Sequence, residues 1–294
     1  MTKPQTEALH QASEGLDALP LPDIARILAE SQIAAAEAVH KAIPEISKAA
    51  EHMALTLKSG GVLHYVAAGS SGLMAAADAQ ELGGTFSIPP AQLRIHMAGG
   101  LPTGVEMPGD TEDDTAGLAT TLSALTDKDS VIAVSASGET PFTLAAAEIA
   151  QAAGASVISI ANNPDTTLLR RADVAICIPT PPEVLSGSTR MGAGTAQKIA
   201  LNMMSTLMAV ALGHVHDGMM VNLFADNAKL RKRAADIVAH IAEVDTDIAT
   251  AALKATDGAV KPAVLLARGQ DPEAAKALLI ETENNLRAAL ARIT

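Results

Sequence analysis

The stretch VLHYVAAGSSGLMAAADAQE, residues 62–81, decides the fold that this sequence predicts. Its first five residues form a short apolar run of the kind found in buried strands, and the run stops at the turn AGSSG. Residues 73–81 then have the pattern of a helix. The free N–H groups at a helix start attract an anion, and glycines let the backbone turn tightly there. Such turns are also common without a ligand, so this one alone leaves phosphate binding open.

The composition predicts a folded protein that binds neither nucleic acid nor membrane. The 294 residues can form one large or two modest domains, and 48% of them are hydrophobic. A net charge of −12 repels a phosphate backbone, and one Tyr, three Phe and no Trp leave little for base stacking. No segment approaches an uncharged span of about 18 apolar residues, and the first residues lack the apolar part of a signal peptide. We therefore expect a cytoplasmic location.

The single cysteine, Cys177, lies in the apolar run VAICI at residues 174–178. A thiol in such a run is expected to fill the core rather than to act as a nucleophile. One cysteine also excludes a disulfide within the chain.

Further apolar runs predict a parallel sheet. They cover residues 92–97, 130–134, 157–160 and 174–178, and helical patterns alternate with most of them. Residues 23–54 also have helical spacing, and Pro44 is expected to divide them into two helices. Strands alternating with helices predict an α/β fold in which a parallel sheet is flanked by helices as three αβα layers. Ligands of such sheets bind outside the carboxyl ends of the strands.

A second serine-rich loop strengthens the prediction of a phosphate site. The loop SASGETP, residues 135–141, follows the strand predicted at residues 130–134. The two loops together offer the hydroxyl groups of Ser70, Ser71, Ser135, Ser137 and Thr140. Hydroxyl and backbone N–H groups can hold a phosphate without a lysine or a metal. The sequence has no G-x-x-x-x-G-K-[ST] pattern, so an ATPase-like P-loop is unsupported.

The second loop resembles the S-x-S-G-x-T phosphate motif of sugar isomerase (SIS) domains. Over nearly its whole length the chain is similar to the N-acetylmuramic acid 6-phosphate etherases, which are related to the glucokinase regulatory protein. The matching segments are Thr6-Glu7, AGSSG, Asp78-Ala79-Gln80-Glu81, MAGG at 97–100, Thr111-Glu112-Asp113, SASGETP, GSTRMGAGTAQK at 187–198 and NAKL at 227–230. The segment GSTRMGAGTAQK is the most specific of these.

The resemblance implies a lyase that removes D-lactate from the C3 ether of an amino-sugar 6-phosphate by elimination and hydration, without a metal or organic cofactor. By matching motifs, Glu81 corresponds to the general acid and Glu112 to the base. The substrate-binding residues that the resemblance and the two loops indicate are Ser70, Ser71, Gly72, Ser135, Ser137, Gly138, Thr140, Ser188 and Arg190. The family's active site is completed by a second subunit, so the resemblance also implies a homodimer.

The resemblance implies three parts along the chain. N-terminal helices occupy residues 1–60, an SIS-type phosphosugar-binding domain occupies 61–225, and a small helical module occupies 226–294. Residues 196–212 predict a long apolar helix, and we expect residues 219–224 to extend it.

The chain departs from the family's pattern at several positions. The family usually has basic residues where this sequence has Leu73, Glu139 and Gly192, and it commonly has Cys-Pro-Pro where this sequence has residues 82–84, Leu-Gly-Gly. Fewer basic groups weaken the binding of a strongly anionic substrate. The exact sugar and leaving group therefore stay open.

Plainer interpretations exist for several of these residues. Taken alone, Glu81 is one acid on an alanine-rich helix, and Glu112 belongs to a solvated acidic loop. Glu139 fits the start of a helix, where its charge is favoured, and His64 and His96 fit the core or its rim. Two other functions also remain: an aldose–ketose isomerase that uses the same phosphate loops, and a phosphosugar sensor without catalysis. The presence of both Glu81 and Glu112 favours the lyase.

Overall fold

The computed structural model describes residues 4–223, 225 and 227–293. The chain forms two compact units. The first consists of Met1–Gln80 and Ala91–Ser205, and the second of Glu81–Pro90 and Thr206–Thr294. Each unit is described by itself below.

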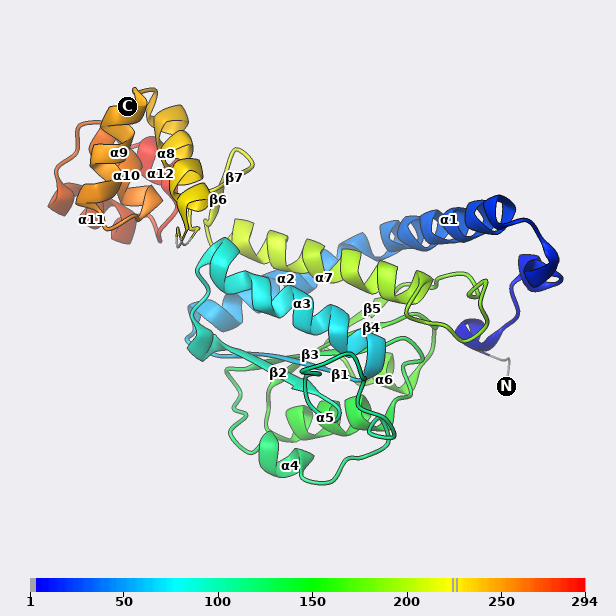
Figure 1. Ribbon diagram of the computed structural model, residues 1–294. Coiled ribbons are helices and arrows are strands. Elements are labelled where there is room, and N and C mark those ends of the chain that lie inside the picture. The colour runs from blue at the N-terminus through cyan, green and yellow to red at the C-terminus, as the bar shows by residue number, and fades with distance from the viewer. Residues whose placement is uncertain (1–3, 224, 226, 294) are drawn as a thin grey trace. The chain divides into compact units, whose positions relative to one another are not determined.

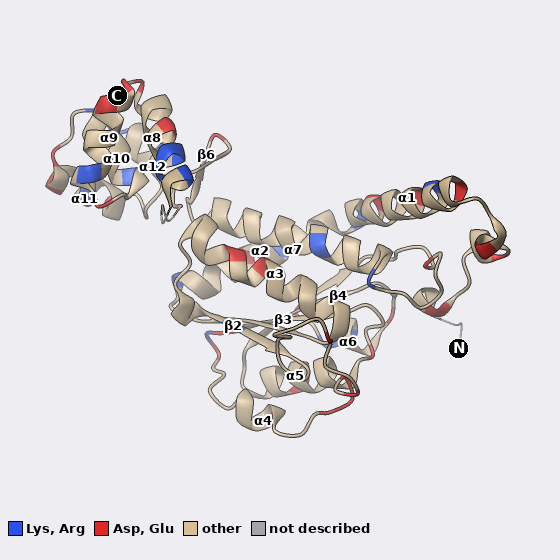
Figure 2. Cartoon of the chain, viewed as in Figure 1, with Lys and Arg blue, Asp and Glu red and all other residues tan. Residues whose placement is uncertain are grey.

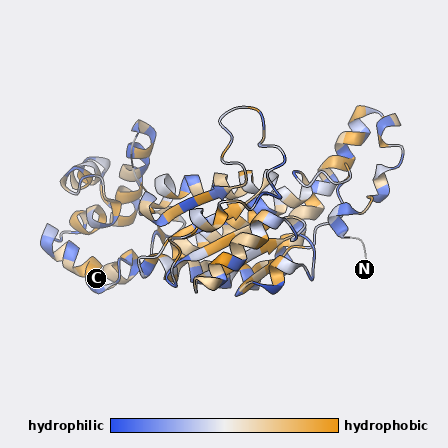
Figure 3. Ribbon diagram, turned by 90° about the horizontal axis from the view of Figure 1, so that it is seen from below, coloured by the Kyte–Doolittle hydropathy of each residue, from blue (hydrophilic) through white to orange (hydrophobic). Residues whose placement is uncertain are grey.

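The first unit is built on a parallel sheet whose strands confirm the predicted fold class. The strands are β1 (Leu63–Ala67), β2 (Leu93–Met97), β3 (Ser130–Ser135), β4 (Ser156–Ala161) and β5 (Val174–Cys177), in the order β2-β1-β3-β4-β5. All residues of β1 and β3 are buried, as expected of strands covered on both faces, and hydrophobic colours predominate among the packed elements in the middle of Figure 3. Ala67 pairs with Val134, so the carboxyl ends of β1 and β3 meet at one edge.

Helices cover both faces of this sheet (Figure 1). One face carries α2 (Ile43–Lys58), α3 (Gly69–Phe86) and α7 (Gly192–Ala211), and the other carries α4 (Leu118–Thr121), α5 (Pro141–Ala152) and α6 (Thr167–Arg170). The arrangement confirms the predicted three αβα layers.

The expected break at Pro44 is confirmed. Helix α1 (Leu21–Ala38) ends in the 3-10 helix Val39–Ala42, and α2 begins at Ile43 with Pro44 in its first turn. Proline fits that turn because the first N–H groups of a helix have no partner within it. In the middle of a helix the same ring would remove a hydrogen bond and clash with the preceding turn.

A buried carboxylate joins β1, α3 and α7. Asp78, which is only 4% exposed, accepts hydrogen bonds from the hydroxyl of Tyr65 at 3.2 Å, Nδ2 of Asn202 at 2.8 Å and Oγ of Ser205 at 2.9 Å. Burial and the nearby Asp78 charge raise the pKa of Tyr65 well above its usual value, so its hydroxyl stays a donor. Hydrogen bonds to a charged acceptor are among the stronger ones in proteins, so this network fixes the position of α3 against the sheet.

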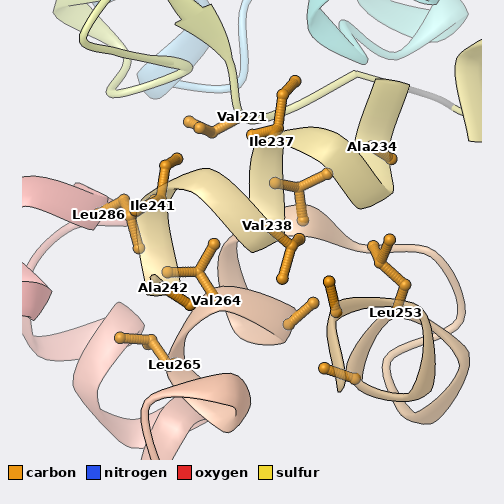
Figure 4. Packing of buried hydrophobic residues seen from close by; sticks show 14 of the residues in the cluster. Val221, Ala234, Ile237, Val238, Ile241, Ala242, Leu253, Val264, Leu265 and Leu286 are labelled. Carbon is orange, nitrogen blue, oxygen red and sulfur yellow. The ribbon is translucent and has the colours of Figure 1, made fainter. Parts of the chain in front are cut away.

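The second unit contains a helical module with its own core. Its helices are α8 (Ala228–Ala242), α9 (Thr246–Ala255), α10 (Val260–Ala267), α11 (Pro272–Glu281) and α12 (Leu286–Leu290). Figure 4 shows Val238 and Val264, both fully buried, facing one another across this core. Its buried side chains are mostly alanine, valine, leucine and isoleucine, in agreement with the scarcity of aromatic residues in the sequence.

The prediction that residues 219–224 extend the preceding helix is wrong. Helix α7 ends at Ala211, and a short antiparallel hairpin follows, formed by β6 (Val215–His216) and β7 (Met219–Met220). The turn between them is Asp217-Gly218, with φ angles of 45° and 75°. An Asp-Gly pair adopts these angles readily and is a strong signal for a two-residue hairpin. Phe224 lies outside the described residues.

Within the described part of the chain, no helix is both long enough and apolar enough to cross a membrane.

Candidate active site

A polar cavity of 210 Å³ lies in the first unit, where β1 and β3 end. Its lining comes from four places in the sequence: the N-terminal segment, the turn after β1, the loop after β3, and the segment before α7. Glu112 adds a side chain from a separate loop. The lining residues are Thr6, Glu7, Ala68, Ser70, Ser71, Glu112, Ser135, Ala136, Ser137, Thr140, Gly187 and Thr189. The cavity thus unites both predicted serine-rich loops with Glu112.

The turn after β1 presents the start of α3 to this cavity. The helix begins at Gly69, and its first closing bond runs from the Gly72 N–H to the Ala68 carbonyl at 3.0 Å. The N–H groups at the start of a helix have no acceptor within it, and Ser70 and Ser71 add hydroxyl groups. Gly72 does not line the cavity. A Cβ on Gly72 would lie 2.8 Å from Cγ of Met97, so this glycine lets α3 pack closely against β2.

The loop after β3 is held in shape by the hydroxyl of Ser135. That oxygen accepts the Gly138 N–H at 3.0 Å, and it lies 2.8 Å from Oγ1 of Thr140 and 3.3 Å from Oγ of Ser137. Gly138 has a φ of 70° and no room for a side chain, because a Cβ there would collide with Thr166. Its contribution is therefore backbone geometry. The hydroxyl groups of Ser135, Ser137 and Thr140 are therefore held close to one another.

Glu112 reaches the cavity from the long loop between β2 and α4. Its carbonyl oxygen accepts the Phe142 N–H at 3.0 Å, which attaches the loop to the start of α5. Its carboxylate lies against Gly69, since a Cβ on that residue would be 2.5 Å from Oε1 of Glu112. The structure therefore places the predicted base directly beside the first serine-rich turn.

The segment before α7 contributes Gly187 and Thr189, which the sequence did not single out as site residues. The predicted residues Ser188 and Arg190 alternate with them and do not line the cavity, although Arg190 is exposed. Main-chain bonds fix this segment, including one from the Gly194 N–H to the Thr189 carbonyl at 2.8 Å.

A buried glutamate occupies the start of α7. Glu183 is 2% exposed, and its two carboxylate oxygens accept the N–H groups of Gly192 and Ala193, each at 2.9 Å. The site that a helix start offers to an anion is therefore filled by the protein itself at α7. No local spacing in the sequence reveals this cap, because Glu183 lies nine residues before Gly192.

Glu139 and Gly192, which stand where the family usually has basic residues, have local structural roles. Oε1 of Glu139 accepts the Thr167 N–H at 2.7 Å, at the start of α6. Gly192 packs against the capping carboxylate, because a Cβ there would lie 3.1 Å from Oε2 of Glu183. Leu73 also stands where the family usually has a basic residue. It is half-buried on α3, and nothing in the structure explains why leucine replaces a basic residue there.

Glu81 lies on α3, about three helical turns after Ser70. It is exposed, belongs to the second unit and is absent from the cavity lining. The two glutamates predicted to work together are therefore not both in the cavity that the first unit forms.

The described residues of the lining include two carboxylates, Glu7 and Glu112, and no lysine or arginine. Further acidic residues follow Glu112 on its loop, drawn red between β2 and α4 in Figure 2. Anion binding would therefore depend on hydroxyl groups, backbone N–H groups and the dipole of α3. In residues 4–223, 225 and 227–293, no group of three or more His, Cys, Asp or Glu side chains could hold a metal ion.

Comparison with known proteins identifies the family. The N-acetylmuramic acid 6-phosphate etherase of Streptomyces coelicolor is 41% identical over 291 residues, which cover 97% of this chain and 93% of that protein. The enzyme of the same name from Deinococcus radiodurans is 41% identical over 269 residues, 90% of this chain and 88% of that protein. This chain belongs to the N-acetylmuramic acid 6-phosphate etherase family. The resemblance found in the sequence is thereby confirmed.

The SIS domain model matches residues 106–211 of this etherase-family chain. The match contains Glu112, the loop after β3 and the segment before α7, whereas the turn after β1 precedes it. The solved structure of the c3406 protein of Escherichia coli CFT073 has a TM-score of 0.50 and 17% identity, covering 68% of this chain and 97% of that chain. Together, the domain match and this likeness confirm the SIS-type fold of the etherase-family chain.

Proposed function

We propose that the protein is a carbon–oxygen lyase acting on N-acetylmuramic acid 6-phosphate or a related amino-sugar 6-phosphate. It would cleave the D-lactyl ether to give N-acetylglucosamine 6-phosphate and D-lactate. Membership of the etherase family supports this function. The observation that carries it in the structure is the carboxylate of Glu112 beside the AGSSG turn, in one cavity with the SASGETP loop.

The substrate phosphate would bind at the start of α3. Ser70 and Ser71 offer hydroxyl groups from one side, and Ser135, Ser137 and Thr140 offer them from the other. Gly72 and Gly138 would contribute indirectly, by letting the backbone of the two loops pack where a side chain does not fit. The predicted contacts of Ser188 and Arg190 belong to the same proposal. The exposed Arg190 side chain would reach the lactyl carboxylate once substrate is bound.

The reaction would proceed by elimination followed by hydration. Glu112 would remove the proton from C2 of the sugar while the bond between C3 and the ether oxygen breaks. Glu81 would give a proton to that oxygen as lactate leaves, and a double bond between C2 and C3 remains. Water then adds across it, its oxygen going to C3 and a proton to C2. In this proposal both the acid and the base are side chains of the protein.

We further propose a homodimer with the active site near the subunit interface. Glu81 is exposed and does not line the cavity of the first unit. A second copy of the chain could bring its own Glu81 to the cavity, which would complete the pair of carboxylates. We also propose that the enzyme works in the cytoplasm, where it would serve the recycling of peptidoglycan sugars.

Incubation of the purified protein with N-acetylmuramic acid 6-phosphate tests this function. Release of D-lactate, measured with a coupled dehydrogenase, is the expected result. If no lactate appears while N-acetylglucosamine 6-phosphate still raises the melting temperature, the protein binds phosphosugars but is not this lyase. That outcome would leave an isomerase or a sensor, which conversion of the added sugar phosphate distinguishes.

A further inference from the structure

The N-terminal segment forms one wall of the cavity. Its 3-10 helix Gln5–Glu7 places Thr6 and Glu7 in the lining, together with side chains of both serine-rich loops. Thr6 is only 2% exposed. A buried polar residue needs hydrogen-bond partners within the protein, so this burial indicates a specific attachment.

That attachment is a two-way link to Asn163. The Oδ1 atom of Asn163 accepts the Thr6 N–H at 3.3 Å, and its Nδ2 donates to Oγ1 of Thr6 at 3.0 Å. The same Nδ2 also lies 3.2 Å from the carbonyl oxygen of Ala136, inside the SASGETP loop. Asn163 is 3% exposed, so water does not compete for these bonds. One buried amide therefore fixes the segment and the phosphate loop in a common geometry.

A second link attaches the segment to another wall of the cavity. Oγ of Ser13 donates to the Val184 carbonyl at 2.7 Å, next to the buried cap Glu183 and shortly before Gly187. The segment is thus tied both to the loop after β3 and to the stretch before α7. These two ties on either side of Glu7 hold the backbone of the segment at the cavity, and Glu7 itself is exposed in the cavity wall.

We propose that Glu7 is a substrate-binding residue that determines specificity, by accepting a hydrogen bond from a hydroxyl or acetamido N–H group of the sugar. The inference rests on the proposed phosphosugar function and adds a third carboxylate to Glu81 and Glu112. An ionised carboxylate only accepts hydrogen bonds, so it cannot bind the phosphate or the lactyl group. Its attractive partners on this substrate are the donor groups of the sugar ring.

The orientation of the substrate follows from the positions of the groups that attract its phosphate and of Glu7, which attracts its hydrogen-bond donors. The anionic phosphate is attracted by the hydroxyl groups of the two serine-rich loops and by the start of α3, and it is repelled by Glu7 and by the carboxylate of Glu112 beside Gly69. The sugar donors are attracted by Glu7. A phosphosugar bound between the two walls would therefore have its phosphate at the serine-rich loops and its donor groups toward the N-terminal segment. A phosphate without a sugar gains nothing from Glu7.

The test compares Glu7→Ala with wild type by calorimetric titration of N-acetylglucosamine 6-phosphate, glucose 6-phosphate and inorganic phosphate. Glu14→Ala is the matched control, since Glu14 is an exposed glutamate of the same segment outside the cavity. We expect Glu7→Ala to weaken N-acetylglucosamine 6-phosphate binding about tenfold or more, the usual cost of losing a charged hydrogen bond. Inorganic phosphate should bind as well as before or better, because a negative charge has gone.

The two sugar phosphates identify the donor. If Glu7→Ala loses affinity only for N-acetylglucosamine 6-phosphate, the donor to Glu7 is the acetamido N–H. If it loses affinity for both sugar phosphates, the donor is a hydroxyl group. The inference would be overturned if Glu7→Ala lost affinity equally for all three ligands, or lost no more affinity than Glu14→Ala. Wild-type protein that binds neither sugar phosphate would also overturn it. A different result would contradict the proposed lyase function: wild-type protein that binds N-acetylglucosamine 6-phosphate but releases no lactate from N-acetylmuramic acid 6-phosphate.

Discussion

The carboxylate of Glu112 lies against the α-carbon of Gly69, so close that a Cβ on residue 69 would be 2.5 Å from Oε1. Gly69 also has a φ of 54°, an angle that residues with side chains seldom adopt. The first glycine of the AGSSG turn therefore has two roles. It begins α3 between the lining residues Ala68 and Ser70, and it leaves the space that Glu112 occupies.

Replacing Gly69 by alanine should displace Glu112 and lower kcat about 100-fold, because a shift of about 1 Å in a reacting group can cost that much. Lactate release under saturating substrate measures the effect. Gly84→Ala is the matched control, since it lies on the same helix with nothing within 4 Å of an added Cβ. Full activity of Gly69→Ala would show that the position of Glu112 is unimportant for the reaction.

Conversion of either proposed catalytic glutamate to glutamine should lower turnover by about 10²–10⁴-fold, the usual contribution of a general acid or base. The binding of N-acetylglucosamine 6-phosphate to Glu81→Gln or Glu112→Gln should change little, which calorimetry can verify. Glu106→Gln serves as the control, because Glu106 is exposed on the loop of Glu112 and does not line the cavity. Activity retained in either variant would remove that residue from the mechanism.

Mixing the two inactive variants tests the shared site. If each cavity uses Glu81 from the partner, a mixed dimer contains one site with both substitutions and one site with neither. Random exchange of subunits should then restore about a quarter of wild-type activity, since half of the dimers are mixed and half of their sites are intact. No recovery after subunit exchange, verified by mass spectrometry of the dimers, would place both glutamates in the same chain's site.

The Asp78 network should be important for stability. Asp78→Asn replaces one acceptor oxygen by an NH₂ group, which would face a donor from Tyr65, Asn202 or Ser205. We expect a loss of about 1–3 kcal/mol in the free energy of unfolding. Denaturant titration measures it, with the exposed Asp17→Asn as the control. An unchanged midpoint would mean that the network contributes no stability.

Acid should destabilise the protein through His96. Its Nε2 lies 3.0 Å from Nδ1 of His64, with ring planes within 4° and centroids 5.3 Å apart, so the rings meet edge to edge through one hydrogen bond. Burial first, and then the charges of His64 and Arg94, lower the pKa of His96 to about 4. Burial and Arg94 also lower the pKa of His64, while Asp129 opposes them.

The sign of the pH effect follows from these shifts. An unfolded chain takes up a proton on each histidine near pH 6.5, whereas the folded chain does so only at lower pH. Stability should therefore be lost as the pH falls from about 6.5 toward about 4. Melting temperatures across this range should decline less steeply for His96→Gln than for wild type. Parallel curves for the two proteins would contradict the assignment.

Local pattern was sufficient to predict much of this molecule. The five strands and the break at Pro44 follow from hydrophobic runs and from the geometry of proline, both of which act over a few residues. The serine-rich loops were placed at one sheet edge by the rule for parallel strands. The hairpin at residues 215–220 was missed because the apolar run at residues 219–224, which begins in its second strand, outweighed the Asp217-Gly218 turn signal.

The remaining features depend on contacts between distant parts of the chain. Thr6 and Asn163 are 157 residues apart, and no sequence pattern around either residue predicts the hydrogen bonds between them. The cap of Glu183 on α7 and the contact of Glu112 with Gly69 are of the same kind. Periodicity describes which face of an element is buried, but it does not say which loops meet. Such contacts come from the fold as a whole.

The described lining of the cavity contains no lysine or arginine. This absence affects how fast an anionic substrate binds. The chain carries a net charge of −12, so a sugar phosphate approaches against a repulsive field rather than along an attractive one. Dissolved salt screens that field within about 10 Å at 0.1 M. The association rate constant should therefore rise with ionic strength, the reverse of the behaviour of enzymes that steer phosphates with cationic clefts. Substrate capture by this protein would be fastest in a concentrated electrolyte.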